Sequence, residues 1–78
     1  MNQIMIEVEK YLTKEGKYTI AEDDNLFEKG YLDSMGILEL ISIIEDISNQ
    51  EFNPEVFSAE NFETIDAINK LIAIEFND

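Results

Sequence analysis

Three segments of the chain carry large apolar residues at helical spacing, and this periodicity constrains the fold more than any other feature. The strongest spans residues 34–48 or 34–49, where isoleucine and leucine recur every three or four positions. Such a stripe is typical of a helix that buries one face. Asp33 precedes it and is a favourable N-cap residue. The predicted buried stripe consists of Ile37, Leu40, Ile41, Ile44 and Ile47.

A first helix is predicted over residues 2–15 and a last helix over residues 65–76. Asn2 and Thr64 precede them as candidate N-caps, and Gly16 is a natural stop for the first helix. The predicted core residues are Met5, Val8 and Leu12 with Ile4 and Tyr11 at the edges, and Ile65, Ile68, Leu71, Ile72 and Phe76 in the last helix.

The connection over residues 17–32 is long for a chain of this size, so apolar side chains are expected to fix it to the core. A short turn over residues 26–29, ended by Gly30, is predicted inside it. The candidate anchors are Ile20, Leu26, Phe27 and Leu32.

The segment between the second and last helices contains Pro54, which predicts a non-helical entry to this loop. Ser58 is a candidate cap for a short helix over residues 59–62. Together the segments indicate an all-α fold: a small, antiparallel-like four-helix bundle of three main helices and one short helix, with a long first loop. With 78 residues, one domain over residues 1–78 of a free-standing monomer is expected.

The composition excludes most kinds of catalytic and metal site. The sequence holds no cysteine and no histidine. A Ser-His-Asp triad, a thiol nucleophile and a zinc–thiolate site are therefore impossible. Asp23-Asp24-Asn25 lacks the alternation of a calcium-binding loop. We therefore expect neither an enzyme nor a metal site. No apolar run approaches the roughly 18 residues of a membrane span, and no signal peptide is visible, so a cytoplasmic protein is expected.

The net charge of −13 is unevenly distributed. Residues 30–69 contain nine acidic residues and no lysine. Nucleic acids and anionic membranes are poor partners for such a chain, because both need basic patches. A field of one sign favours encounter with basic partners, although a solvated surface that keeps the protein soluble is the plainer interpretation.

The run LFEKGYLDSMG, residues 26–36, places Ser34 at the start of the second helix directly after Asp33. An isolated Asp-Ser pair is ordinary helix-start chemistry. Here, however, Met35 and Leu38 fall away from the apolar stripe and are followed by Glu39 and other acids. Exposed Met and Leu beside acids indicate a contact surface.

This pattern resembles the acyl carrier and peptidyl carrier protein family. The signature region of such proteins reads Leu-Phe-x-x-Gly-x-x-Asp-Ser-Leu/Met, followed by an apolar helix with Glu-Leu. The chain has LFEKGYLDSM at residues 26–35 and EL at residues 39–40. A second family-like block, ENFETIDAI, lies at residues 60–68. Both blocks at this separation make the resemblance specific.

The resemblance implies an acyl-carrier-protein-like fold and a covalent 4′-phosphopantetheine arm on Ser34, supplied from coenzyme A by a phosphopantetheinyl transferase. Acyl, aminoacyl or peptidyl groups would be held on this arm as thioesters and passed between a loading ligase and acyl-transfer enzymes. Asp33 would help to dock the transferase. The resemblance assigns recognition of basic partner surfaces to Met35, Leu38, Glu39, Ser42, Glu45 and Asp46.

The sequence departs from carriers of fatty-acid synthesis at Tyr31 and Gly36 and in the loop at residues 52–54. The form is more like D-alanyl carriers and stand-alone carriers of specialised pathways, so an aminoacyl or specialised cargo is favoured. Gly36 is expected to allow close approach of the arm or of a partner. Two alternatives stay open: an unmodified acidic interaction protein, such as an inhibitor or charge mimic, and a carrier that is never modified.

Overall fold

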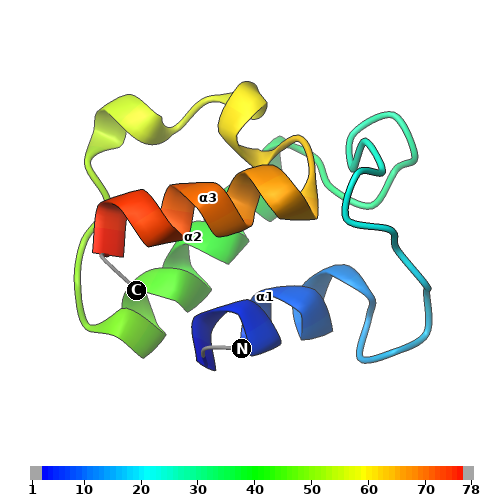
Figure 1. Cartoon of the computed structure of the whole chain (residues 1–78), viewed down its shortest axis with the longest axis horizontal. Helices are drawn as coiled ribbons and strands as arrows, with labels where there is room; N and C mark the ends of the chain where they lie inside the picture. Colours follow the sequence, from blue (N-terminus) through cyan, green and yellow to red (C-terminus); the bar gives the residue numbers. More distant parts are fainter. Residues whose placement is uncertain (1–2, 77–78) are drawn as a thin grey trace.

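The computed structural model describes residues 3–76, and within them the chain forms only helices and turns (Figure 1). This confirms the predicted all-α class. The elements are α1 (Gln3–Leu12), α2 (Ser34–Ser48), the 3₁₀ turns η1 (Pro54–Val56) and η2 (Ala59–Phe62), and α3 (Ile65–Phe76).

The bounds of α2 and α3 are those that the sequence predicts, because each helix begins at a side-chain cap. The Asp33 carboxylate accepts a hydrogen bond from the Gly36 N–H at 2.8 Å, and the Thr64 hydroxyl accepts one from the Ala67 N–H at 2.9 Å. At its far end α2 stops at Asn49, which adopts the left-handed conformation.

The prediction for α1 is wrong at its C-terminal end, because the helix stops at Leu12 and not at residue 15. The Thr13 hydroxyl donates to the Glu9 carbonyl at 2.8 Å and accepts from the Gly16 N–H at 3.1 Å, which closes the helix early. Lys14 and Glu15 then take positive φ angles of 55° and 57°. The predicted cap Asn2 lies outside the described residues.

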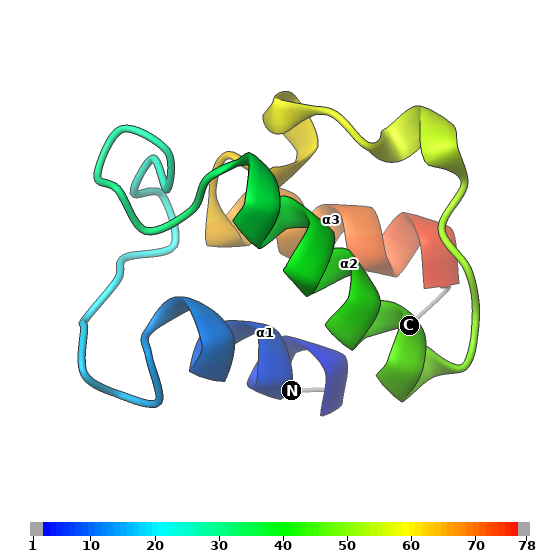
Figure 2. The ribbon, with the colours of Figure 1, turned by 180° about the vertical axis from the view of Figure 1, so that it is seen from behind.

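The three helices pack at different angles rather than as a regular bundle. Viewed from behind, α1 runs in the opposite sense to α3, and α2 crosses between them obliquely (Figure 2). In that view α2 and α3 run in the same general sense, so the antiparallel arrangement holds for α1 alone. The long first loop leaves α1 at one end of the molecule and returns to the start of α2.

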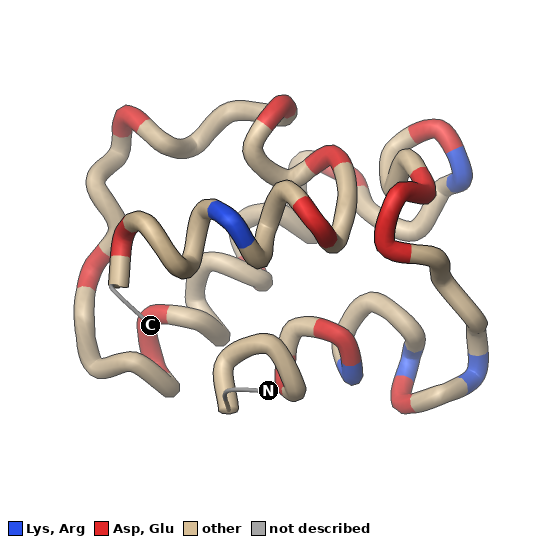
Figure 3. The backbone as a smooth tube through the Cα atoms, in the orientation of Figure 1, with Lys and Arg blue, Asp and Glu red and all other residues tan. Residues whose placement is uncertain are grey.

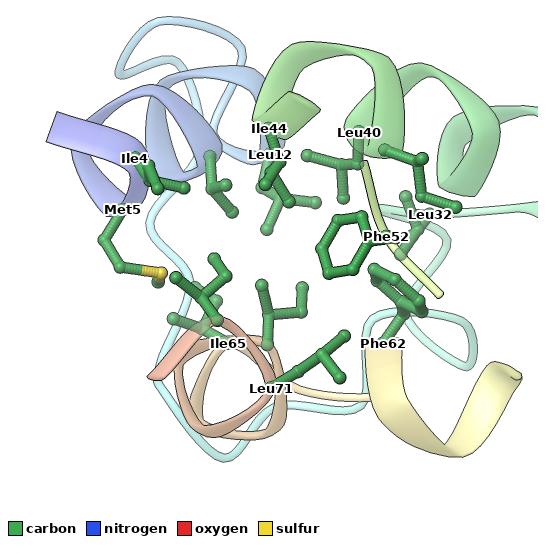
Figure 4. Close-up of a cluster of buried hydrophobic side chains, with 14 of the residues drawn as sticks. Ile4, Met5, Leu12, Leu32, Leu40, Ile44, Phe52, Phe62, Ile65 and Leu71 are labelled. Atoms are coloured by element: carbon green, nitrogen blue, oxygen red, sulfur yellow. The ribbon is translucent and has the colours of Figure 1, made fainter. Parts of the chain in front are cut away.

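The core forms where the three apolar stripes meet (Figure 4). All five predicted residues of α3 are buried, and the α2 stripe is buried at its centre, with Ile37 and Ile47 half-buried at its edges. Leu26 and Leu32 of the first loop are also buried, as predicted, with Ile20 and Phe27 half-buried against them. The buried residues from α1 are Ile4, Met5, Val8 and Leu12.

Backbone hydrogen bonds hold the first loop against the start of α3. The Leu26 N–H donates to the Glu63 carbonyl at 2.8 Å, and the Asp66 N–H donates to the Glu22 carbonyl at 3.1 Å. The second bond also satisfies an amide at the open N-terminus of α3. The loop that leads to Ser34 is therefore part of the fold.

The segment after α2 is anchored by Phe52, which the sequence did not identify as a core residue. Phe52 is 4% exposed, and its ring lies 4.7 Å from that of Phe76 and 6.5 Å from that of Phe62. The extended Asn53 agrees with the predicted entry, but a 3₁₀ turn begins at Pro54.

The predicted short helix is present at Ala59–Phe62 as a 3₁₀ turn. The Ser58 side chain does not cap this turn; the Ser58 backbone carbonyl accepts from the Asn61 N–H at 3.1 Å instead.

Candidate functional site

A tight turn delivers the chain to α2. The Asn25 side-chain oxygen accepts from the N–H groups of Phe27 and Glu28, and Gly30 ends the turn at a φ of 79°. The N–H groups of Tyr31 and Leu32 both donate to the Leu26 carbonyl, at 2.8 and 3.1 Å. The next residues, Asp33 and Ser34, are thereby placed at a fixed point on the surface.

Ser34 is the first residue of α2, and its side chain is exposed. Its hydroxyl makes no hydrogen bond to any residue between positions 3 and 76. It stands at the N-terminus of a 15-residue helix, where the partial positive charge of the backbone favours a bound phosphate. Asp33 lies beside it, and one of its carboxylate oxygens accepts the Gly36 N–H as the cap of α2.

The chain packs closely beneath this helix start at Gly36. A Cβ atom on Gly36 would lie 2.8 Å from Leu32 Cδ1, 3.3 Å from Asp33 Oδ1 and 3.5 Å from the Tyr11 hydroxyl. Gly36 is also buried. The close approach that its missing side chain allows is therefore made by the protein's own residues, in place of the arm or partner expected from the sequence.

The predicted recognition residues lie along one exposed side of α2 and differ in how free they are. Met35 and Leu38 are 66% and 57% exposed, which is unusual for large apolar side chains in a small domain. Ser42 and Asp46 are also exposed. The structure thus brings together an apolar pair and polar neighbours one or two helical turns from Ser34.

Two of the predicted recognition acids hold the fold as well. The Glu39 carboxylate accepts a hydrogen bond from the Tyr11 hydroxyl of α1 at 2.5 Å. The Glu45 carboxylate accepts one from the Phe52 N–H at 2.9 Å, and Glu45 is half-buried. Sequence reasoning missed both roles, because these partners lie 28 and 7 residues apart in the chain.

The contact with Glu39 changes the acidity of Tyr11. Partial burial, the hydrogen bond to Glu39 and the nearby charges of Glu39 and Asp33 together raise the pKa of the Tyr11 phenol to about 12. The Lys14 ammonium lies over this ring, 5.6 Å from its centroid. A groove of about 270 Å³ is bordered by Tyr11 of α1, by Lys14, by residues 30–33 of the first loop and by the side of α2 that carries Met35 and Glu39.

Charge is divided between the two halves of the chain. Lys10, Lys14, Lys17 and Lys29 belong to α1 and the first loop, and Lys70 alone lies on α3 (Figure 3). Lys10 and Lys29 are paired with Glu7 and Asp24. The surface of α2 carries acids without a neighbouring lysine in its own sequence.

Other site types find no support in the described part of the chain. Residues 3–76 contain no group of three acidic, histidine or cysteine side chains placed to hold a metal ion. Within the same range, no helix combines the length and the apolar character that a membrane crossing requires.

These features define a class of protein: a small helical domain that presents one free serine at a helix start, with an exposed apolar and acidic surface beside it. The serine fits a covalent phosphodiester, because its hydroxyl is accessible and unbonded and the helix end is electropositive.

The comparison with protein families agrees with this class. A family model described as the phosphopantetheine attachment site matches residues 3–72, and the chain therefore belongs to this family of acyl and peptidyl carrier proteins. No curated protein and no solved structure matched the chain.

The family attaches 4′-phosphopantetheine covalently, so the protein is a phosphopantetheine-carrying carrier protein. Carrier proteins of this family interact with phosphopantetheinyl transferases and with acyl-handling enzymes, and the family is in general non-catalytic.

Proposed function

We propose that Ser34 is the attachment residue, and that the arm on it carries aminoacyl or specialised acyl groups as thioesters to partner enzymes with basic docking surfaces. The observation that carries this proposal is the Ser34 hydroxyl, which is exposed, without an internal hydrogen bond among residues 3–76, and at the N-terminus of α2. The family match over residues 3–72 supports a single carrier domain. When bound, the arm supplies the thiol that this cysteine-free chain lacks.

We infer that a second protein catalyses the attachment of the arm to Ser34. In the transfer, the Ser34 oxygen forms a bond to the pantetheine-bearing phosphorus of coenzyme A, the diphosphate bond breaks, and adenosine 3′,5′-bisphosphate leaves. The serine proton needs a base. No histidine is available in the chain, and the nearest carboxylate in sequence, that of Asp33, is already bonded to the Gly36 N–H. We assign the base and the metal ion that activates the phosphate to the transferase.

The test is an intact-mass measurement after incubation with coenzyme A and a phosphopantetheinyl transferase of broad specificity. We expect a gain of one phosphopantetheine group in the wild-type protein and in Ser58→Ala, which removes another exposed serine, outside α2 and its recognition residues. Ser34→Ala should show no gain. A gain that persists in Ser34→Ala, or no gain in the wild-type protein, overturns the assignment of Ser34.

The cargo preference rests on the resemblance of the Tyr31–Gly36 region to D-alanyl and specialised carriers. Tyr31 packs on Tyr18 with ring centroids 5.7 Å apart, and Gly36 is buried, so both residues have packing roles in the fold. Loading of the arm-bearing protein by a D-alanine-activating ligase and by a malonyl transferase tests the preference. Faster loading by the malonyl transferase contradicts it.

A further inference from the structure

Tyr11 of α1 joins two elements at the edge of the predicted recognition surface. Its hydroxyl lies 3.5 Å from the position that a Gly36 Cβ would take, and it donates to the Glu39 carboxylate. Gly36 and Glu39 are one helical turn apart, so they share the side of α2 that faces α1. A larger residue at position 36 would stand between the phenol and this side of the helix.

Glu39 is exposed, and the bond from Tyr11 favours one orientation of its carboxylate. A free glutamate on a helix surface samples several rotamers, and a partner that binds it must first order it. Here the ordering has taken place before any partner arrives. The oriented carboxylate borders the 270 Å³ groove, and Met35, 66% exposed, lies on the same border.

We propose that Tyr11 is a positioning residue for partner recognition: it fixes the Glu39 carboxylate beside Met35, so that the recognition surface of α2 extends across the groove to the end of α1. The proposal rests on the proposed function, since it assumes a partner that docks on α2 to reach Ser34. The partner it fits is a protein that places a cationic side chain on Glu39 and an apolar pocket over Met35.

The kinetic test uses the transferase with three versions of the apo-protein. Tyr11→Phe keeps the ring and its contact with Lys14 but removes the hydroxyl. Tyr18→Phe is the matched control, because Tyr18 packs on Tyr31 in the first loop. We expect Tyr11→Phe to raise the KM of the transferase for the carrier about threefold to tenfold, the cost of ordering one long side chain, with kcat little changed. Tyr18→Phe should leave both constants at the wild-type values.

A second readout follows the bond itself in the free protein. The groups that face the Tyr11 phenol are Glu39 on α2, Asp33 at the N-cap of α2, and Lys14 beyond the end of α1. Nuclear magnetic resonance of tyrosine labelled at the phenolic carbon gives the titration of each ring. In Glu39→Gln the Tyr11 titration should move down toward that of an ordinary tyrosine, and Tyr18 should not move. A Tyr11 titration that is unchanged in Glu39→Gln contradicts the fixed contact.

The outcomes separate this inference from the assignment of Ser34. If the wild-type protein is modified at Ser34 but Tyr11→Phe and Tyr18→Phe share the wild-type KM, the positioning role is wrong and the proposed function stands. If the wild-type protein is not modified, both are overturned, and the titration reports only that the two helices are tied. A variant that has lost its thermal transition is unfolded, and its kinetic constants do not report on docking. Tyr11→Leu, which has no hydrogen-bond donor in its side chain, is therefore measured beside Tyr11→Phe and must raise KM as well.

Discussion

The close packing under Ser34 gives a prediction whose sign is set by a single contact. In an isolated helix, replacing Gly36 by Ala stabilises by up to about 1 kcal/mol. In this protein the new Cβ would lie 2.8 Å from Leu32 Cδ1, well inside van der Waals contact. Leu32 is 5% exposed and surrounded by the core, so its side chain has little room to turn away. Overpacking of this kind costs about 1–3 kcal/mol.

A second penalty falls on the cap of α2. The same Cβ would lie 3.3 Å from Asp33 Oδ1, the atom that accepts the Gly36 N–H. Displacing this oxygen weakens a cap that is worth about 0.5–2 kcal/mol. The overpacking and the weakened cap together exceed the gain in helix propensity. We therefore expect Gly36→Ala to lower the free energy of unfolding by about 1 kcal/mol. For a domain of this size, that corresponds to a fall in Tm of roughly 4–8 °C.

The assay is urea and thermal denaturation followed by far-UV circular dichroism at one fixed salt concentration. The matched background is Leu32→Val, which removes the Cδ1 atom and is itself expected to cost about 1 kcal/mol. In that background the contact with Leu32 Cδ1 is gone, and only the contact with Asp33 Oδ1 opposes the gain in helix propensity. Gly36→Ala should therefore be less destabilising than in the wild-type protein, by about 1–3 kcal/mol. If Gly36→Ala raises Tm in the wild-type protein, or changes it equally in both backgrounds, the contact with Leu32 does not decide the effect.

Four further predictions follow from the same structure. Asp33→Asn keeps a side-chain acceptor and should change the free energy of unfolding by less than about 0.5 kcal/mol, while Asp33→Ala should lose about 1 kcal/mol; equal losses contradict the capping role. Glu45→Ala leaves the Phe52 N–H without its acceptor and should cost about 1–3 kcal/mol, whereas Asp46→Ala, which removes the same charge from an exposed side chain, should stay within about 0.5 kcal/mol in urea denaturation. Because the pKa of Tyr11 is raised to about 12 from 10.0, its contribution to stability is complete below pH 10 and is lost as the pH rises through 12. After solvent screening we expect the free energy of unfolding to fall by about 1 kcal/mol over this range. If the free energy of unfolding of Tyr11→Phe falls equally between pH 10 and 12, this prediction is refuted. Since the net charge is −13, raising the ionic strength to about 0.15 M, where the Debye length is near 8 Å, should raise Tm, and a flat or falling Tm shows that charge repulsion is unimportant.

The parts of the fold that local sequence determines could be predicted closely. The start of α2 depends on Asp33 and that of α3 on Thr64, and both caps act on amides three residues away. The predicted end of α1 is wrong, because the sequence indicates Gly16 as the stop of the helix. The helix ends earlier, at Leu12, because the Thr13 hydroxyl bonds to backbone groups on both sides of it. The spacing of apolar residues gives no information about these bonds.

The candidate site could be located from sequence but not described. A helix start and an apolar-acidic surface follow from the motif around Ser34. The contacts of Tyr11 with Glu39 and of Glu45 with Phe52 depend on how α1 and the loop after α2 pack, which periodicity does not specify. For the same reason Phe52 looked like a departure from the family pattern, although its ring lies in the core.

These contacts change how the acids of α2 can be used to study docking. A count of carboxylates treats Glu39, Glu45 and Asp46 as equal contributors to a negative field. In the structure Glu39 is tied to α1 and Glu45 to the following loop, while Asp46 is exposed and forms no side-chain hydrogen bond or ion pair with the described residues. Replacing either tied acid alters the fold as well as the field, so a loss of partner binding in those variants has two causes. Asp46 is therefore the position at which charge reversal measures docking electrostatics alone, and the difference between Asp46→Lys and Glu39→Lys measures how much of the recognition depends on an acid held in place by Tyr11.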